Sequence, residues 1–111
     1  MNSVVIVGRA GQDSDIKYFE SGKVRTTFSL AVNRWDSKTK AEVTDWFNID
    51  VWDKQAEFAG EYIKKGILVG VEGRIAQNKW VDKASGEDRE SLYVVANNIR
   101  LLSSKRDIEQ I

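Results

Sequence analysis

The sequence feature that most constrains the fold is a strict alternation of apolar and polar residues in the stretch TDWFNIDVW. From Phe47 to Val51 every second side chain is apolar, as expected of a β-strand that buries one face, because successive side chains of a strand point to opposite faces. The other row holds Trp46 and Trp52 together with an amide and a carboxylate. The alternation therefore predicts a strand that directs two tryptophans away from the core.

Further segments show the same period of two. Residues 23–33 alternate before the polar segment DSKTKAE, so the two long strands on either side of that segment predict an extended β-hairpin finger. Residues 4–7 form a continuous apolar run, which predicts a strand buried on both faces. Residues 16–19 suggest a short strand, and residues 67–80 and 90–102 predict two more, joined by the polar loop DKASGEDRE.

Between the hairpin and the last two strands the period changes to that of a helix. Asp53 is the expected N-cap and Gly66 the expected stop. The side expected to face the core carries Phe58, Ala59, Tyr62 and Ile63. One helix that does not alternate with the strands argues against a parallel sheet. The order predicts an all-β domain with one helix, a five-stranded Greek-key barrel of the oligonucleotide/oligosaccharide-binding type (OB-fold), with an open α+β sheet as the alternative.

Composition excludes several kinds of site. The 111 residues contain neither cysteine nor histidine, which removes a disulfide framework, a thiolate nucleophile and the commonest general base. We expect no catalytic residue, no metal and no other cofactor. The absence of a run of 18 apolar residues predicts a protein that does not enter membranes. We expect it in the cytoplasm of a bacterium, or in an organelle as an imported mature form.

All four tryptophans of the chain fall on the polar row of a strand or directly extend it. They are Trp35, Trp46, Trp52 and Trp80. Outward aromatic rings beside cations suit a single nucleic-acid strand, because exposed bases stack on the rings at about 1–3 kcal/mol each and cations neutralise the phosphates. The cations expected beside them are Arg34, Lys54, Arg74 and Lys79. The alternative for a single tryptophan is packing at a β-bulge, and for a single cation an ordinary solvated charge.

Several motifs in register resemble those of bacterial-type single-stranded DNA-binding proteins, an OB-fold family also found in organelles. The motifs are MNSVVIVGRAGQDSDIKYFESGK, FSLAVNRW, TDWFNIDVWDKQAEFAGEYIKKG, VGVEGRIAQNKW and VVANNIRLL. The resemblance implies a DNA-binding barrel over residues 1–102, a homotetramer, and base stacking by the four tryptophans. It also implies a non-catalytic, largely sequence-independent protein that protects single-stranded DNA in replication, recombination and repair.

The chain also departs from the family pattern. Phe47 stands where some members carry a histidine at a contact between subunits, and Ala76 and Asn78 stand where relatives often carry basic residues. The family's long tail with an acidic tip, which recruits replication and repair proteins, is missing after Leu102. We therefore expect a short tail over residues 103–111, with such partner proteins still candidates.

Two other functions stay open. One, suggested by the resemblance, is a primosome-type accessory protein with the same fold that mainly binds proteins, although relatives of that kind tend to lack the full set of tryptophans. The other is a carboxylate enzyme such as a glycosidase, which needs two carboxylates facing one substrate. Asp45 and Asp50 lie on opposite rows of their strand, which argues against that use.

Overall fold

The computed structural model describes residues 1–103, so the expected tail falls almost entirely outside the described residues. The elements along the chain are β1 (Val4–Ala10), β2 (Asp15–Tyr18), β3 (Val24–Asp36), β4 (Ala41–Trp52), α1 (Lys54–Tyr62), β5 (Leu68–Val81) and β6 (Asp88–Leu101). No helix among these residues is long and apolar enough to cross a membrane.

Five of the strands close into a barrel. β1 pairs with β5, β5 with β6, β6 with β4 and β4 with β3, and β3 returns to β1 where Arg9 lies opposite Ala31. The β4–β6 pair is parallel, with Ile49 opposite Val94. β2 adds to the edge of β3 beside β1. This closure confirms the predicted OB-fold barrel and rules out the open α+β sheet.

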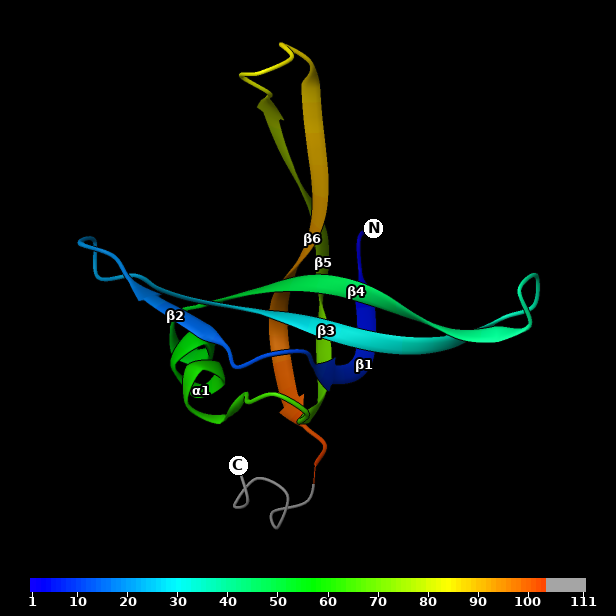
Figure 1. The fold of residues 1–111 in the computed structure, drawn as a ribbon. Helices are drawn as coiled ribbons and strands as arrows, with labels where there is room; N and C mark the ends of the chain where they lie inside the picture. The colour runs from blue at the N-terminus through cyan, green and yellow to red at the C-terminus, as the bar shows by residue number, and fades with distance from the viewer. Residues whose placement is uncertain (104–111) are drawn as a thin grey trace.

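Two long hairpins extend from the barrel (Figure 1). β3 and β4 stay paired from Arg25–Trp52 to Asp36–Ala41, which confirms the predicted finger. β5 and β6 form a second finger, and their pairing continues as far as Val81 opposite Asp88. The loop between them is therefore shorter than the sequence predicts. Arg89 holds the end of this finger by ion pairs with Asp82 and Glu87, both at 3.5 Å.

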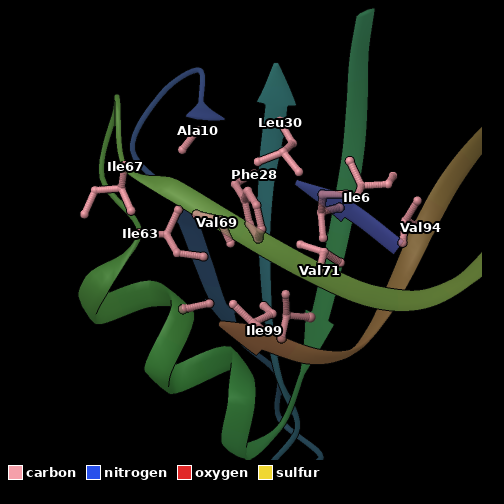
Figure 2. Packing of buried hydrophobic residues seen from close by; sticks show 13 residues of the cluster. Ile6, Ala10, Phe28, Leu30, Ile63, Ile67, Val69, Val71, Val94 and Ile99 are labelled. Atoms are coloured by element: carbon pink, nitrogen blue, oxygen red, sulfur yellow. The ribbon is translucent and has the colours of Figure 1, made fainter. Parts of the chain in front are cut away.

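The hydrophobic core fills the barrel interior and the space beneath α1 (Figure 2). The predicted apolar rows of the central strands provide most of it: Phe28, Leu30, Ile49, Val51, Val69 and Val71. β1 contradicts its prediction of burial on both faces. Ile6 and Ala10 face the core, whereas Val5 is 70% exposed and Val7 is 50% exposed. One face of β1 lines the barrel, and no described residue covers the other.

The face of α1 that meets the barrel also differs from the prediction. Ala59 and Ile63 are buried as expected, together with Ala56, but Phe58 and Tyr62 are exposed and contact each other. The helix lies close to the strands, so the side chains on its inner face must be small. A Cβ placed on Gly60 would come within 2.9 Å of Ile16 Cδ1, which shows how closely β2 and the helix approach. Close approach selects small side chains here over large apolar ones.

The two ends of α1 depart from the expected signals as well. Asp53 stands at the N-cap position with φ +60°, and its side chain makes no capping hydrogen bond. A different contact, in which the hydroxyl of Thr26 donates to the carbonyl oxygen of Ala56 at 2.6 Å, ties β3 to the first turn of the helix. The helix ends at Tyr62, before Gly66, whose φ of +90° turns the chain toward β5.

Candidate nucleic-acid interface

Three tryptophans lie on one face of the β3–β4 finger. In the antiparallel register Trp52 lies opposite Arg25 and Trp46 lies opposite Ala31, and Trp35 continues the row that contains Arg25 and Ala31. Opposed residues share a face of the sheet and a row repeats at every second residue, so all three side chains point to the same side. Their exposed fractions run from 38% for Trp52 to 66% for Trp35. The structure thus brings three predicted stacking residues onto one surface.

A groove of about 550 Å³ follows this face. Its lining residues from β3, β4 and the β5–β6 finger include Arg25, Thr27, Asn48, Trp52, Asn78 and Tyr93. The lining combines aromatic rings with short polar side chains. It therefore offers both stacking surfaces and hydrogen-bonding groups.

Trp80 belongs to the second finger. It lies opposite Arg89 and on the same row of β5 as Asn78, which lines the groove. Alternation along β5 therefore directs Trp80 to the side of the finger that faces the groove. Its exposed fraction is 47%. The fourth tryptophan continues the aromatic surface away from the barrel.

The indole of Trp46 is exposed to solvent and is also held in position by the neighbouring backbone. Its six-membered ring lies over Gly11, where a Cβ would come within 2.3 Å of Cζ3. The amide of Gly11 donates to the carbonyl oxygen of Ser29 at 3.0 Å, which fixes that backbone against β3. A glycine is needed here because any side chain would occupy the space of the ring.

Two side chains, Phe19 and Arg25, lie against Trp52. The ring of Phe19 stacks against it with centroids 5.9 Å apart and planes 23° from parallel, and the Arg25 guanidinium carbon lies 5.8 Å from its ring centre. Arg25 also forms an ion pair of 3.1 Å with the buried Asp50. The sequence prediction named neither Phe19 nor Arg25. The alternation along β3 could have identified Arg25 as a site residue, because it lies on the same row as Trp35. The contact of Phe19 with Trp52 depends on which strands pair, and the sequence pattern does not reveal this.

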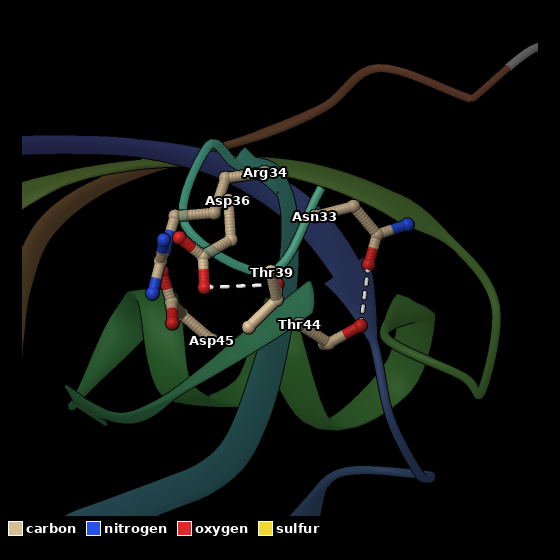
Figure 3. Close-up of polar contacts among 6 residues, drawn as sticks. All are labelled: Asn33, Arg34, Asp36, Thr39, Thr44 and Asp45. Carbon is tan, nitrogen blue, oxygen red and sulfur yellow. Dashed lines mark hydrogen bonds and ion pairs between the residues drawn. The ribbon is translucent and has the colours of Figure 1, made fainter. Parts of the chain in front are cut away.

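Arg34 lies away from the tryptophan face, although it precedes Trp35 in the chain. It occupies the alternate row of β3, opposite Val43. Its Nε donates to the Asp45 carboxylate at 2.7 Å, and the Asn33–Thr44 hydrogen bond lies on the other side of the hairpin (Figure 3). The structure does not bring Arg34 together with the stacking residues, and its charge is partly neutralised.

The other three predicted cations are exposed and form no ion pair with another residue of the described range. Arg74 lies on the row of β5 that continues to Trp80, so it shares the face of that tryptophan. Lys79 lies on the opposite row, across from Glu90. Lys54 begins α1, two residues after Trp52. The alternation of side chains along β5 thus places Arg74 on the tryptophan face and Lys79 on the reverse face.

The acidic residues are arranged unlike a catalytic pair. Asp45 and Asp50 lie on opposite faces of β4 and contact different arginines, Arg34 and Arg25. Within residues 1–103 no group of three carboxylates gathers in the way that a metal site requires.

A closed five-stranded barrel with two fingers and a shared aromatic face defines an OB-fold binding protein. Residues 1–102 match the single-strand binding protein family, and the chain belongs to this family. This confirms the resemblance seen in the sequence motifs.

Named relatives extend the match over nearly the whole chain. The chain is 50% identical over 107 residues to single-stranded DNA-binding protein 1 of Synechocystis sp., covering 96% of this chain and 88% of the relative. It is 41% identical over 109 residues to the single-stranded DNA-binding protein of Thermosynechococcus vestitus, covering 98% and 88%. It is 36% identical over 110 residues to that of Neisseria meningitidis serogroup A, covering 96% and 63%.

Proposed function

We propose that this protein binds and protects single-stranded DNA, largely without regard to base sequence and without catalysing a reaction. The observation that carries the proposal is the single face of the β3–β4 finger on which Trp35, Trp46 and Trp52 are all exposed. A duplex hides the faces of its bases, whereas a single strand can lay them on aromatic rings. Membership of the single-strand binding protein family supports the same conclusion.

The proposed mechanism combines two kinds of contact, base stacking on aromatic rings and phosphate contacts to cations. Bases stack on Trp35, Trp46, Trp52 and Trp80. Phosphates contact Lys54 and Arg74, and Lys79 only where the strand passes round to the reverse face of the β5–β6 finger; all three are exposed and free of ion pairs within the described chain. Arg34 would have to exchange Asp45 for a phosphate before it could contribute. Affinity should therefore have a salt-resistant part from stacking and a salt-sensitive part from the phosphates.

The relatives support a proposal for the biological setting. Bacterial proteins named single-stranded DNA-binding protein match almost the full chain, and we propose that this protein acts in the bacterial cytoplasm during replication, recombination and repair. Replication and repair proteins are proposed partners. The expected lack of an acidic tip concerns residues that lie outside the described range.

We also propose that the chain assembles as a homotetramer. Val5 and Val7 on β1 and Leu92 on β6 are exposed apolar side chains, and such surface often marks an interface. Phe47 is half-buried and lines an apolar groove of about 280 Å³ with Val4 and Leu92. Light scattering after size exclusion tests this assembly. A Val7→Lys variant that remained a tetramer would argue against the β1 surface as an interface.

Tryptophan fluorescence during titration with oligo-dT, at low and at high salt, tests the DNA-binding proposal. Stacking predicts deep quenching that saturates at a defined ratio of nucleotide to protein and that partly survives high salt. A duplex of equal length should quench weakly. Replacement of Trp46 and Trp52 by alanine should weaken binding, whereas Phe58→Ala on α1 should not. Unchanged affinity in the Trp46/Trp52 variant would refute stacking as the mechanism.

A further inference from the structure

We propose that the DNA-binding face continues past Trp52 onto β2, where Phe19 stacks on one more base and Lys17 contacts a phosphate. The inference rests on the proposed function and extends its site by a strand. Five stacking side chains would then contribute per subunit.

The strand register supports this extension. Lys17 on β2 lies opposite Arg25 on β3, and Arg25 lies opposite Trp52 on β4. The three side chains therefore form one row across three neighbouring strands and share a face. Phe19 follows Lys17 by two residues and continues its row beyond the end of β2. The stacking of its ring on Trp52 agrees with this placement.

Phe19 is held in place while much of its ring stays in water. Its amide donates to the carbonyl oxygen of Lys23 at 2.9 Å, and the amide of Gly22 donates back to the carbonyl oxygen of Phe19 at 3.0 Å. Gly22 has φ +89°, which permits this tight turn. The side chain is 42% exposed although it contacts Trp52. A fixed, exposed aromatic ring beside another one is a preorganised surface for a base.

The charges around the pair also suit a phosphate backbone. Lys17 is exposed and makes no ion pair within residues 1–103. Arg25 lies over Trp52, and its buried Nε has no hydrogen-bond partner in the described structure. Of the acids on this face that lie near Lys17, Asp50 is already paired with Arg25, and Asp15 lies one step along the row from Lys17, opposite Thr27. Lys17 is thus the cation best placed to neutralise a phosphate beside Phe19.

Photo-crosslinking tests the contact directly. Full-length protein with Phe19→p-benzoylphenylalanine should crosslink to oligo-dT, whereas Phe58→p-benzoylphenylalanine should not. Phe58 is a matched control because it is a similarly exposed phenylalanine that contacts another aromatic ring, Tyr62, on α1. An absence of crosslinking at position 19 in a protein whose tryptophans are quenched by oligo-dT would overturn the inference and leave the proposed function intact.

Affinity measurements provide the second readout. Phe19→Ala should weaken oligo-dT binding by roughly 5- to 20-fold, the lower part of the range expected for loss of one stacked base, and Phe19→Trp should restore it. Thermal melting checks that both variants fold. Weaker binding by Phe19→Ala without crosslinking at position 19 would assign Phe19 only to supporting Trp52, and so would overturn a direct contact.

The phosphate contact has its own test. Lys17→Gln should make the slope of log affinity against log salt shallower by about 0.7, the value expected for one contact to a single strand. Lys65→Gln, after the end of α1, should leave the slope unchanged. Equal slopes for the Lys17 variant and the wild type would remove Lys17 from the interface. If oligo-dT did not quench the tryptophan fluorescence of the wild-type protein at all, the proposed function itself would be contradicted.

Discussion

The indole of Trp46 lies directly over the backbone of Gly11, so that a Cβ on this glycine would come within 2.3 Å of the ring. We expect Gly11→Ala to push the indole out of its place and weaken oligo-dT binding by roughly 5- to 10-fold. Because Trp46 is largely exposed, the ring can swing into solvent, and the free energy of unfolding should fall by less than about 1 kcal/mol. Fluorescence titration and urea denaturation measure the two quantities.

A double-mutant cycle shows whether Gly11→Ala acts through the indole. In a Trp46→Ala background the alanine at position 11 has no ring to displace, so its effect on affinity should disappear. Equal effects in both backgrounds would show that Gly11 acts by another route.

Asp50 places a carboxylate on the floor of the groove, where it holds Arg25 at 3.1 Å. We expect Asp50→Asn to raise the affinity for oligo-dT by roughly 3- to 10-fold at low salt, since Arg25 becomes available to a phosphate. The salt slope should steepen by about 0.7. Stability should fall by about 1 kcal/mol, because the pair is lost but Arg25 can reach water.

Asp45→Asn is the matched control for that change. Asp45 also pairs with an arginine from β3, but on the reverse face of the same finger. Its removal should leave both affinity and salt slope near the wild-type values. A gain in affinity as large as that of Asp50→Asn would show that general charge, rather than place in the groove, controls binding.

Gly73 lies at the bulge between β5 and β6, where Glu72 pairs with Asn98 but Gly73 pairs with Ala96. A Cβ at this position would come within 2.1 Å of the Val95 carbonyl oxygen, which belongs to the backbone and cannot move aside. Gly73→Ala should therefore lower the free energy of unfolding by about 3 kcal/mol or more.

Gly70→Ala on the same strand provides the comparison. The nearest atom to its added Cβ is Leu102 Cδ1 at 3.3 Å, the mobile end of a side chain. Its cost should stay within about 1 kcal/mol in urea denaturation. If the two variants were equally stable, the backbone at the β5–β6 bulge would be able to move away from the added methyl group, contrary to this expectation.

The alternation of apolar and polar residues predicts β3 and β4 correctly for a physical reason. Each strand buries one face and leaves the other in water, so apolar and polar residues separate by parity and the outward tryptophans stand out. The same reasoning fails in β1, because a continuous apolar run suggests two buried faces whereas Val5 and Val7 are exposed. An apolar side chain by itself does not reveal whether the monomer covers it.

Other parts of the structure depend on distances that no local pattern encodes. The prediction for α1 placed Phe58 and Tyr62 inward because helical periodicity groups them with Ala59. The close approach of helix and barrel instead requires small residues such as Ala56 and Gly60. The contact of Phe19 with Trp52 arises from the pairing of β2 with β3 and of β3 with β4. These contacts become visible only once the sheet order is known.

The two arginines predicted to contact phosphates should behave differently. Arg74 shares a face with Trp80 and forms no ion pair within the described chain, whereas Arg34 lies on the reverse face of the β3–β4 finger and is bound to Asp45 at 2.7 Å. Arg74→Gln should make the salt slope shallower by about 0.7 and lower affinity at low salt, because one phosphate contact is lost.

Arg34→Gln should leave both quantities nearly unchanged, since the charge removed is already neutralised by Asp45 and points away from the tryptophans. The two variants have the same change of side chain and of net charge, so any difference between them reports the position and the ion pairing of the arginine. Titrations with oligo-dT at several salt concentrations measure both. A shallower slope for Arg34→Gln would mean that the strand of DNA also contacts the reverse face of the β3–β4 finger and draws Arg34 away from its carboxylate.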